Sequence, residues 1–148
     1  MSHSCATNLV HCVWSTKYRK DTIPEPLLEQ LWAYFVGIGR NKRIPVIAAG
    51  GMRNHVHLGI ALPASVKLSD AVSAFKANSS RWLKHQGVKR FEWQTGYGAF
   101  SFGISQISQV RRYIHNQAEH HKNYSFEQEF LELLRRAGVD YDPRHVFE

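Results

Sequence analysis

The sequence has little cysteine and no long hydrophobic run. Its 148 residues contain two cysteines, Cys5 and Cys12, and no second pair accompanies them to form a zinc knuckle or a disulfide framework. We therefore expect reduced thiols in a cytoplasmic protein. No apolar stretch approaches the ~20 residues that cross a bilayer, and the first residues lack a basic region followed by an apolar run. Neither membrane insertion nor secretion is expected.

Acidic residues are also in the minority. Asp and Glu number 12 against 19 Lys and Arg, which gives a net charge of +7 and a pI of about 9.6. This excess favours an anionic partner, nucleic acid above all, although a soluble protein that is merely basic is the alternative. A chain of this length is expected to form one domain, residues 1–148, with its own hydrophobic core.

The apolar pattern predicts alternating strands and helices. Residues with strand periodicity and β-rich composition occur at 8–14, 44–49, 55–62 and 98–103. Helices are expected between the first two strands, ending at Gly37 and Gly39, and between the last two, opening at Ser69. Two more helices should begin near Ser105 and Ser125. The order β-α-β-β-α-β is the ferredoxin-like plan, an α+β fold with an antiparallel sheet.

Two short segments hold most of the candidate chemistry. In an extended strand alternate side chains share a face, so His55 and His57 point to the same side. Tyr113 and Gln117 are one turn apart on the expected helix, so they project side by side. Two imidazoles, an amide oxygen and a phenol together predict a metal site with a tyrosine beside it.

The segment around Tyr113 has a helical pattern. At roughly 100° per residue, one narrow stripe holds Ile107, Val110, Ile114, Ala118 and His121. We expect this stripe of a helix over 105–121 to dock on the sheet. Tyr113 and Gln117 lie along its flank, while Arg111 and Arg112 point toward solvent or a phosphate backbone.

Each pattern also has a simpler interpretation. A lone His-x-His pair is often two polar residues on a solvated strand face, and a tyrosine commonly lies at the rim of a core. The segment His-Val-His-Leu at 55–58 is also similar to the motif of histidine-triad nucleotide hydrolases. That motif needs a third histidine where this chain has Gly59, so we reject it.

Four segments of the chain resemble the single-tyrosine HUH transposases, a family that includes insertion-sequence transposases and REP-associated tyrosine transposases. In chain order they are residues 54–57, 93–101, 113–117 and 116–121. The first is similar to the family's histidine-hydrophobe-histidine motif, and the third to its nucleophile helix with a metal ligand one turn later. The resemblance covers nearly the whole chain.

The resemblance implies that His55, His57 and Gln117 bind a divalent ion, Mg²⁺ or Mn²⁺, and that Tyr113 is the nucleophile, with the two histidines sharing in catalysis. A phenol with a pKa near ~10 is mostly protonated at neutral pH, so its attack on a phosphodiester needs electrostatic help. The expected products are a 5′-phosphotyrosine and a free 3′-hydroxyl. Because the covalent bond conserves the phosphodiester's energy, no nucleotide cofactor is implied.

We therefore expect a single-stranded DNA transposase and endonuclease that cleaves and rejoins DNA near hairpin ends. The alternatives are a non-catalytic, domesticated DNA or RNA hairpin-binding protein and a metal-dependent hydrolase that activates water. Insertion-sequence relatives are dimers that complete each site in trans, whereas REP-associated relatives can be monomers. We favour a homodimer, because the chain is compact and ends soon after its final helix.

Basic side chains are expected to contact the DNA backbone. Those just past the first strand are the leading candidates, and aromatic residues among the basic ones, such as Tyr18 and Tyr97, could stack on bases. The full set of expected DNA-binding residues is Lys17, Arg19, Lys20, Arg53, Lys76, Arg81, Arg111 and Arg112.

Overall fold

The computed structural model describes residues 2–148; Met1, the first residue of the expected domain, lies outside them. Strands and helices alternate in the order β1 (Leu9–Ser15), α1 (Leu28–Lys42), β2 (Val46–Met52), β3 (His55–Ala61), α2 (Leu68–His85) and β4 (Gly98–Phe102). Three helices follow: α3 (Ile107–His115), α4 (Gln117–His120) and α5 (Phe126–Ala137). The α+β class and the ferredoxin-like order are confirmed.

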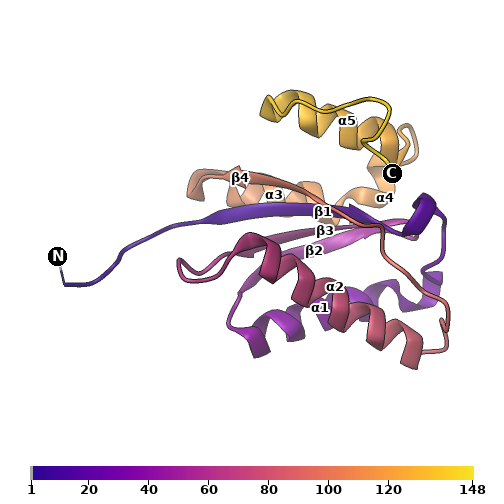
Figure 1. Cartoon of the computed structure of the whole chain (residues 1–148), viewed down its shortest axis with the longest axis horizontal. Helices are drawn as coiled ribbons and strands as arrows, with labels where there is room; N and C mark the ends of the chain where they lie inside the picture. Colours follow the sequence, from indigo (N-terminus) through magenta and orange to yellow (C-terminus); the bar gives the residue numbers. More distant parts are fainter. Residues whose placement is uncertain (1) are drawn as a thin grey trace.

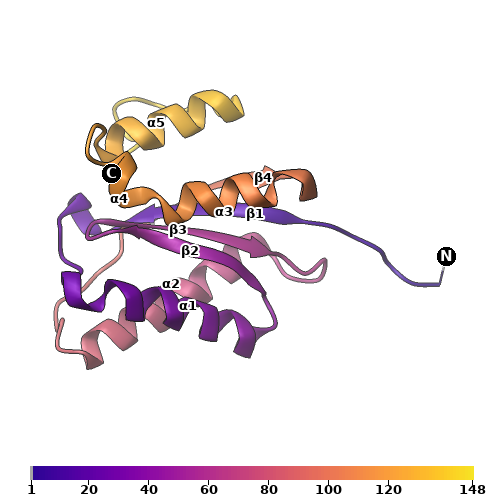
Figure 2. The same ribbon diagram turned by 180° about the vertical axis from the view of Figure 1, so that it is seen from behind.

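The four strands form one antiparallel sheet in the order β2-β3-β1-β4. Helices α1 and α2 cover one face of this sheet, and α3, α4 and α5 lie over the other (Figures 1 and 2). Every residue of β1 is buried, because this strand is flanked by β3 and β4 and covered on both faces. None of the helices in residues 2–148 is long and apolar enough to cross a membrane.

The two faces of the sheet differ in chemistry. On the side of α1 and α2, alternate residues of β1 and β3 join a hydrophobic core whose members include Val10, Cys12, Trp14, Val56, Leu58, Ile60, Leu31, Phe35 and Phe75. On the other side, the same two strands carry His11, His55 and His57, all buried. Buried polar groups need hydrogen-bond partners, so this second face requires a specific set of neighbours.

The end predicted for the first helix was wrong. Helix α1 continues past both expected glycines to Lys42 and stops at Arg43, whose φ of 60° is left-handed. Gly39 is there for a different reason, because a Cβ at this position would collide with the carbonyl oxygen of Ile44. The glycine allows close packing of the chain that returns to the sheet.

The hairpin between β2 and β3 is tighter than predicted. The sequence placed five loop residues at 50–54, but β2 extends to Met52 and Gly50 pairs with His57. A side chain at Gly50 would collide with the backbone of Ile114 in α3. This glycine therefore lets the third helix approach the sheet, and only residues 53 and 54 make the turn. The other predicted strand ends differ by one or two residues.

The long helix predicted over residues 105–121 is interrupted. Asn116, with φ −101° and ψ 24°, separates α3 from α4. Of the predicted apolar stripe, Ile114 is fully buried, whereas Ala118 is exposed and its neighbour Gln117 is buried instead. The break rotates the chain so that the amide of Gln117, rather than the methyl of Ala118, faces the sheet.

Candidate functional site

The His-x-His pair lies on the polar face of β3. His55 and His57 have no exposed surface, and α3 and α4 pack against the strand pair β2 and β3 that carries them. The Nε2 atom of His55 lies 2.9 Å from Oε1 of Gln117. The structure therefore brings the strand and the segment after the helix break together, as the sequence predicted.

Both histidines are held at Nδ1, which directs their Nε2 atoms into the site. Nδ1 of His55 lies 2.7 Å from Oδ1 of Asn54, and Nδ1 of His57 lies 2.8 Å from Nε2 of His11. The side-chain nitrogen of Asn54 donates to the Arg19 carbonyl, which leaves its oxygen to accept the His55 N–H. Burial lowers the pKa of His11 to about 3, so this ring is neutral. Such partners fix the tautomer of a metal-binding histidine. His11, the partner of His57, was not among the site residues predicted from the sequence.

Tyr113 projects into the same cluster from α3. Its ring centroid lies 5.7 Å from that of His57 and 5.8 Å from that of His11. Its hydroxyl donates a short hydrogen bond to Oε2 of Glu129. Burial, the negative charge of Glu129 and this hydrogen bond all raise the pKa of Tyr113 well above its ordinary value. One chain therefore holds all four predicted site residues, with the phenol protonated.

Glu129 of α5 is at the centre of the site and was missed. Its Oε1 lies 3.0 Å from Nε2 of His57, 3.1 Å from Nε2 of His121 and 3.4 Å from Nε2 of His55. Its Oε2 accepts a hydrogen bond of 3.0 Å from the amide nitrogen of Gln117. The sequence carries one signal for this role: the acid occurs on the face of α5 that also holds the apolar residues Phe126, Phe130 and Leu134.

The charges in this cluster follow from burial and hydrogen bonding. Burial by itself would raise the pKa of Glu129, but the adjacent imidazoles of His121, His55 and His57 outweigh it and hold that pKa far below its ordinary value. Burial lowers the pKa of His55 to about 4. For His121 the hydrogen bond and charge of Glu129 outweigh burial, so its pKa is raised. The site is thus a buried carboxylate that attracts positive charge.

Several predicted DNA-binding side chains are engaged within the chain. Arg19, in the 3-10 turn η1 (Lys17–Arg19), forms an ion pair of 2.9 Å with Glu127 and donates to the Phe147 carbonyl. Lys17 is paired with Glu92 at 2.7 Å.

Two other predicted DNA-binding residues donate to backbone carbonyls. Arg53 donates to the carbonyls of Ile23 and Asp21. Lys76 donates to the carbonyls of Gln94 and Gly96.

The remaining predicted basic residues are exposed, although Arg111 donates a long hydrogen bond of 3.4 Å to the Ile47 carbonyl and Arg81 donates one of 3.2 Å to Asn78. Arg111 and Arg112 are exposed on the outer side of α3, where they line a groove with His115 and Asn116. Arg81 is exposed on α2. Lys20 is also exposed, and its ammonium lies 5.6 Å from the ring centre of Tyr18. Among the aromatic residues expected to stack on bases, Tyr18 is 65% exposed and Tyr97 is 39% exposed.

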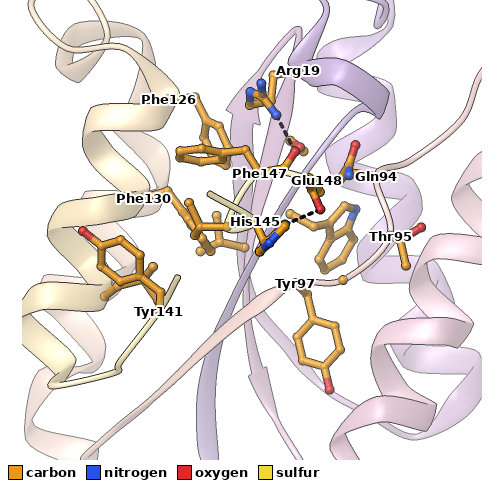
Figure 3. A pocket seen from close by; sticks show the side chains of 16 residues that line it. Arg19, Gln94, Thr95, Tyr97, Phe126, Phe130, Tyr141, His145, Phe147 and Glu148 are labelled. Atoms are coloured by element: carbon orange, nitrogen blue, oxygen red, sulfur yellow. Dashed lines mark hydrogen bonds and ion pairs between the residues drawn. The ribbon is translucent and has the colours of Figure 1, made fainter. Parts of the chain in front are cut away.

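A cavity of about 340 Å³ lies beside the site, between α5 and β1 (Figure 3). Phe126 lines it and also packs on His55, with the ring centroids 4.6 Å apart, so this ring separates the cavity from the histidine cluster. The C-terminal residues His145, Phe147 and Glu148 form another wall, and Arg19 holds Phe147 in place. None of the predicted metal ligands lines this cavity.

Fold and site together define a class: a ferredoxin-like domain with buried histidines and a tyrosine on one face of its sheet. The family described as "Transposase IS200 like" matches residues 5–117 of the chain. The protein belongs to the IS200-like transposase family. That match includes the histidine pair, Tyr113 and Gln117, and it ends before α5.

Two solved structures share the fold. One is a candidate transposase from Deinococcus radiodurans R1, with 22% identity and a TM-score of 0.61, covering 79% of this chain and 95% of that one. The other is a REP-associated tyrosine transposase bound to a REP hairpin, with 14% identity and a TM-score of 0.57, covering 96% and 93% of the two chains. Among curated proteins, no sequence matches this chain.

Proposed function

We propose that the protein is a single-stranded DNA transposase and endonuclease with Tyr113 as nucleophile and a divalent ion bound by His55, His57 and Gln117. The observation that carries this proposal is the convergence of the phenol, the two imidazoles and the amide on one buried face of the sheet. Membership of the IS200-like transposase family supports it. Residues 1–148 would act as one domain, in the cytoplasm.

The donor set fits a divalent ion. His55 donates from Nδ1 to Asn54, so its Nε2 offers a lone pair, and His57 does the same if it donates to the neutral ring of His11. Mixed nitrogen and oxygen ligands suit Mn²⁺ or Mg²⁺ better than a closed structural zinc site. When bound, such an ion polarises the scissile phosphate and offsets developing negative charge.

Tyr113 would perform the covalent step. Its phenol oxygen forms a bond to phosphorus while the bond from phosphorus to the 3′ oxygen breaks, which leaves a 5′-phosphotyrosine and a 3′-hydroxyl. The phenol proton passes to water and the leaving 3′ oxygen takes a proton from water, while the hydrogen bond to Oε2 of Glu129 fixes the position of the phenol oxygen. A DNA 3′-hydroxyl then displaces the tyrosine, so no nucleotide cofactor is needed.

The proposed substrate is single-stranded DNA with hairpin ends. The basic net charge of +7 and the exposed Arg111 and Arg112 support contact with a phosphate backbone. A relative of the same fold is described as bound to a REP hairpin. A partner chain is not needed to bring Tyr113 to His57, and the homodimer stays a prediction, which light scattering over a concentration series tests.

Covalent capture tests the function. Single-stranded oligonucleotides from the DNA flanking the gene, labelled 3′ of the candidate cut, are incubated with protein and Mn²⁺ and run on a denaturing protein gel. We expect a labelled protein band that chelator and Tyr113→Phe remove and Tyr34→Phe retains, because Tyr34 packs on Trp82 away from the site. Cleavage without an adduct would instead indicate water activation.

A domesticated hairpin-binding protein is the second candidate. The hydrogen bond that holds Tyr113 protonated against Glu129 favours it, since a phenol in this state is a poor nucleophile. In that case hairpin DNA would bind, but no adduct would form with Mn²⁺ or with Mg²⁺. Tyr113→Phe would leave the affinity for hairpin DNA unchanged. The same gel, run beside a binding titration, separates the two functions.

A further inference from the structure

One ring nitrogen of His55, Nε2, faces only hydrogen-bond acceptors. A neutral imidazole has one N–H, and that proton belongs on Nδ1, where the Asn54 oxygen accepts it. The other nitrogen, Nε2, faces two oxygens: Oε1 of Gln117 at 2.9 Å and Oε1 of Glu129 at 3.4 Å. In this tautomer three lone pairs point at one another with no hydrogen between them.

His121 repeats the pattern from the other side. Its Nδ1 lies 2.7 Å from the carbonyl oxygen of Tyr124, which can only accept, so Nδ1 carries the proton. Its Nε2 then faces the same two oxygens, Oε1 of Gln117 at 3.0 Å and Oε1 of Glu129 at 3.1 Å. When both rings are neutral, two nitrogens and two oxygens of four side chains thus converge on one point without a donor, which is the arrangement that a metal ion satisfies.

The charge of Glu129 points to the same conclusion. Its side chain is 1% exposed, and within residues 2–148 it forms no ion pair with a lysine or arginine. Its neighbours are imidazoles, an amide and a phenol. A buried carboxylate is costly unless a positive charge accompanies it, and a divalent ion would supply that charge. Ligand atoms of His55, His121 and Glu129 all lie within 4.8 Å of one another, close enough to share one ion.

We propose that Glu129 and His121 are ligands of the divalent ion, so that the C-terminal helix completes a metal site that the first 117 residues leave open. This inference rests on the proposed function and deepens it. Neither residue belongs to the segment that the family match covers. A carboxylate adds a hard, negatively charged oxygen to neutral ligands, which strengthens binding of Mn²⁺ or Mg²⁺.

The same carboxylate links the ion to the nucleophile. While Oε1 faces the imidazoles, Oε2 accepts hydrogen bonds from the Tyr113 hydroxyl and from the amide nitrogen of Gln117. Glu129 therefore holds the phenol at a fixed position relative to the ion's ligands. In this role towards Tyr113, Glu129 is a positioning residue.

A competing interpretation makes the opposite prediction. If the carboxylate merely occupied the ion's place and had to leave before the ion could enter, removing its charge would free the imidazoles. Glu129→Gln would then bind Mn²⁺ as tightly as the unmodified protein or more tightly. If Glu129 is a ligand, the same substitution weakens Mn²⁺ binding by at least about tenfold.

The experiment is a titration of the full chain with Mn²⁺ alone. Calorimetry and electron paramagnetic resonance monitor the binding of the ion. The variants are Glu129→Gln and His121→Gln. The matched control is Glu132→Gln, since Glu132 lies on the same helix but is paired with Arg135 and Arg136 on the surface. Melting curves recorded with chelator establish that each variant is folded.

We expect a loss of affinity of at least about tenfold for both site variants and none for the control. Unchanged or tighter binding by Glu129→Gln would overturn the proposal while leaving the transposase function intact. A folded wild-type chain that binds no Mn²⁺ would overturn both metal assignments. The adduct gel is independent of this titration, so failure of the nucleophile and failure of the ligand set are distinguishable.

Discussion

The two faces of the sheet use the same strands for different purposes. Toward α1 and α2, β1 and β3 present residues such as Trp14 and Leu58, whose contribution is buried apolar area. Toward α3, α4 and α5 they present His11, His55 and His57, whose contribution depends on particular hydrogen bonds. The apolar face should keep most of its stability when one apolar side chain replaces another of similar size. On the polar face, loss of a single hydrogen-bond partner leaves a buried polar group unpaired, which is costly. Stability and function should therefore separate by face.

The largest effect on stability is expected on the apolar face. Phe75 is a buried core residue of α2 and lies beside Phe35. Phe75→Ala should therefore lower the free energy of unfolding by about 3–5 kcal/mol. Urea denaturation measures this, with Val36→Ala on the exposed side of α1 as a control of about 0.5 kcal/mol or less. Reduced Mn²⁺ affinity in the folded fraction of Phe75→Ala would contradict the separation.

On the polar face the largest effect should be on activity. His57→Gln keeps a polar side chain of similar size but removes the imidazole that faces Glu129, so adduct formation at fixed Mn²⁺ should fall by at least about 10²-fold. Its free energy of unfolding should change less than that of Phe75→Ala. Adduct formation at the wild-type rate would remove His57 from the ligand set.

The features that could be predicted from the sequence and those that could not are also divided between the two faces of the sheet. The period of two in β1 and β3 and the helical spacing in α1 and α2 are local signals, so the core and the position of His55 and His57 could be predicted. Glu129 could not be, because its contact with His57 joins residues 72 apart in the chain. An acid on the apolar side of α5 was the only local sign.

The helix break at Asn116 shows a second kind of miss. The apolar spacing continued from Ile114 to Ala118, and no proline or glycine marked an end, so one helix was predicted. The structure instead buries Gln117, whose amide finds His55 and Glu129, and leaves Ala118 exposed. Hydrogen bonding of one buried amide outweighed burial of one methyl group.

Acid should destabilise the polar face specifically. Burial lowers the pKa of His55 from 6.5 to about 4, so between these values the unfolded chain binds a proton that the native residue does not. This contribution is fully present above pH 6.5 and is lost as the pH falls to about 4, by on the order of 3 kcal/mol. His11 contributes with the same sign. Urea denaturation with chelator at several pH values measures the loss.

A pair of variants assigns this pH dependence to the buried rings. His11→Gln keeps an acceptor for His57 but cannot be protonated, so its stability should fall less steeply between pH 6.5 and pH 4. His85→Gln, at an exposed position of α2, should follow the wild-type curve. Identical curves for all three proteins would place the acid sensitivity elsewhere in the chain.

The smallest expected effect concerns DNA binding, where the number of guanidinium donors left free decides which basic residues matter. Arg53, Arg111 and Arg112 are all exposed, but the Arg53 guanidinium donates to two carbonyls of its own chain, whereas Arg111 donates one long hydrogen bond of 3.4 Å to the Ile47 carbonyl. Arg111→Gln with Arg112→Gln should flatten the slope of log affinity against log salt by about 1.4, the value for two lost contacts to single-stranded phosphates. Arg53→Gln should change that slope less, because its donors are not free to bind phosphate. An equal change for both would mean that Arg53 exchanges its internal partners for DNA, and the sequence-based set of basic residues would then be the better guide.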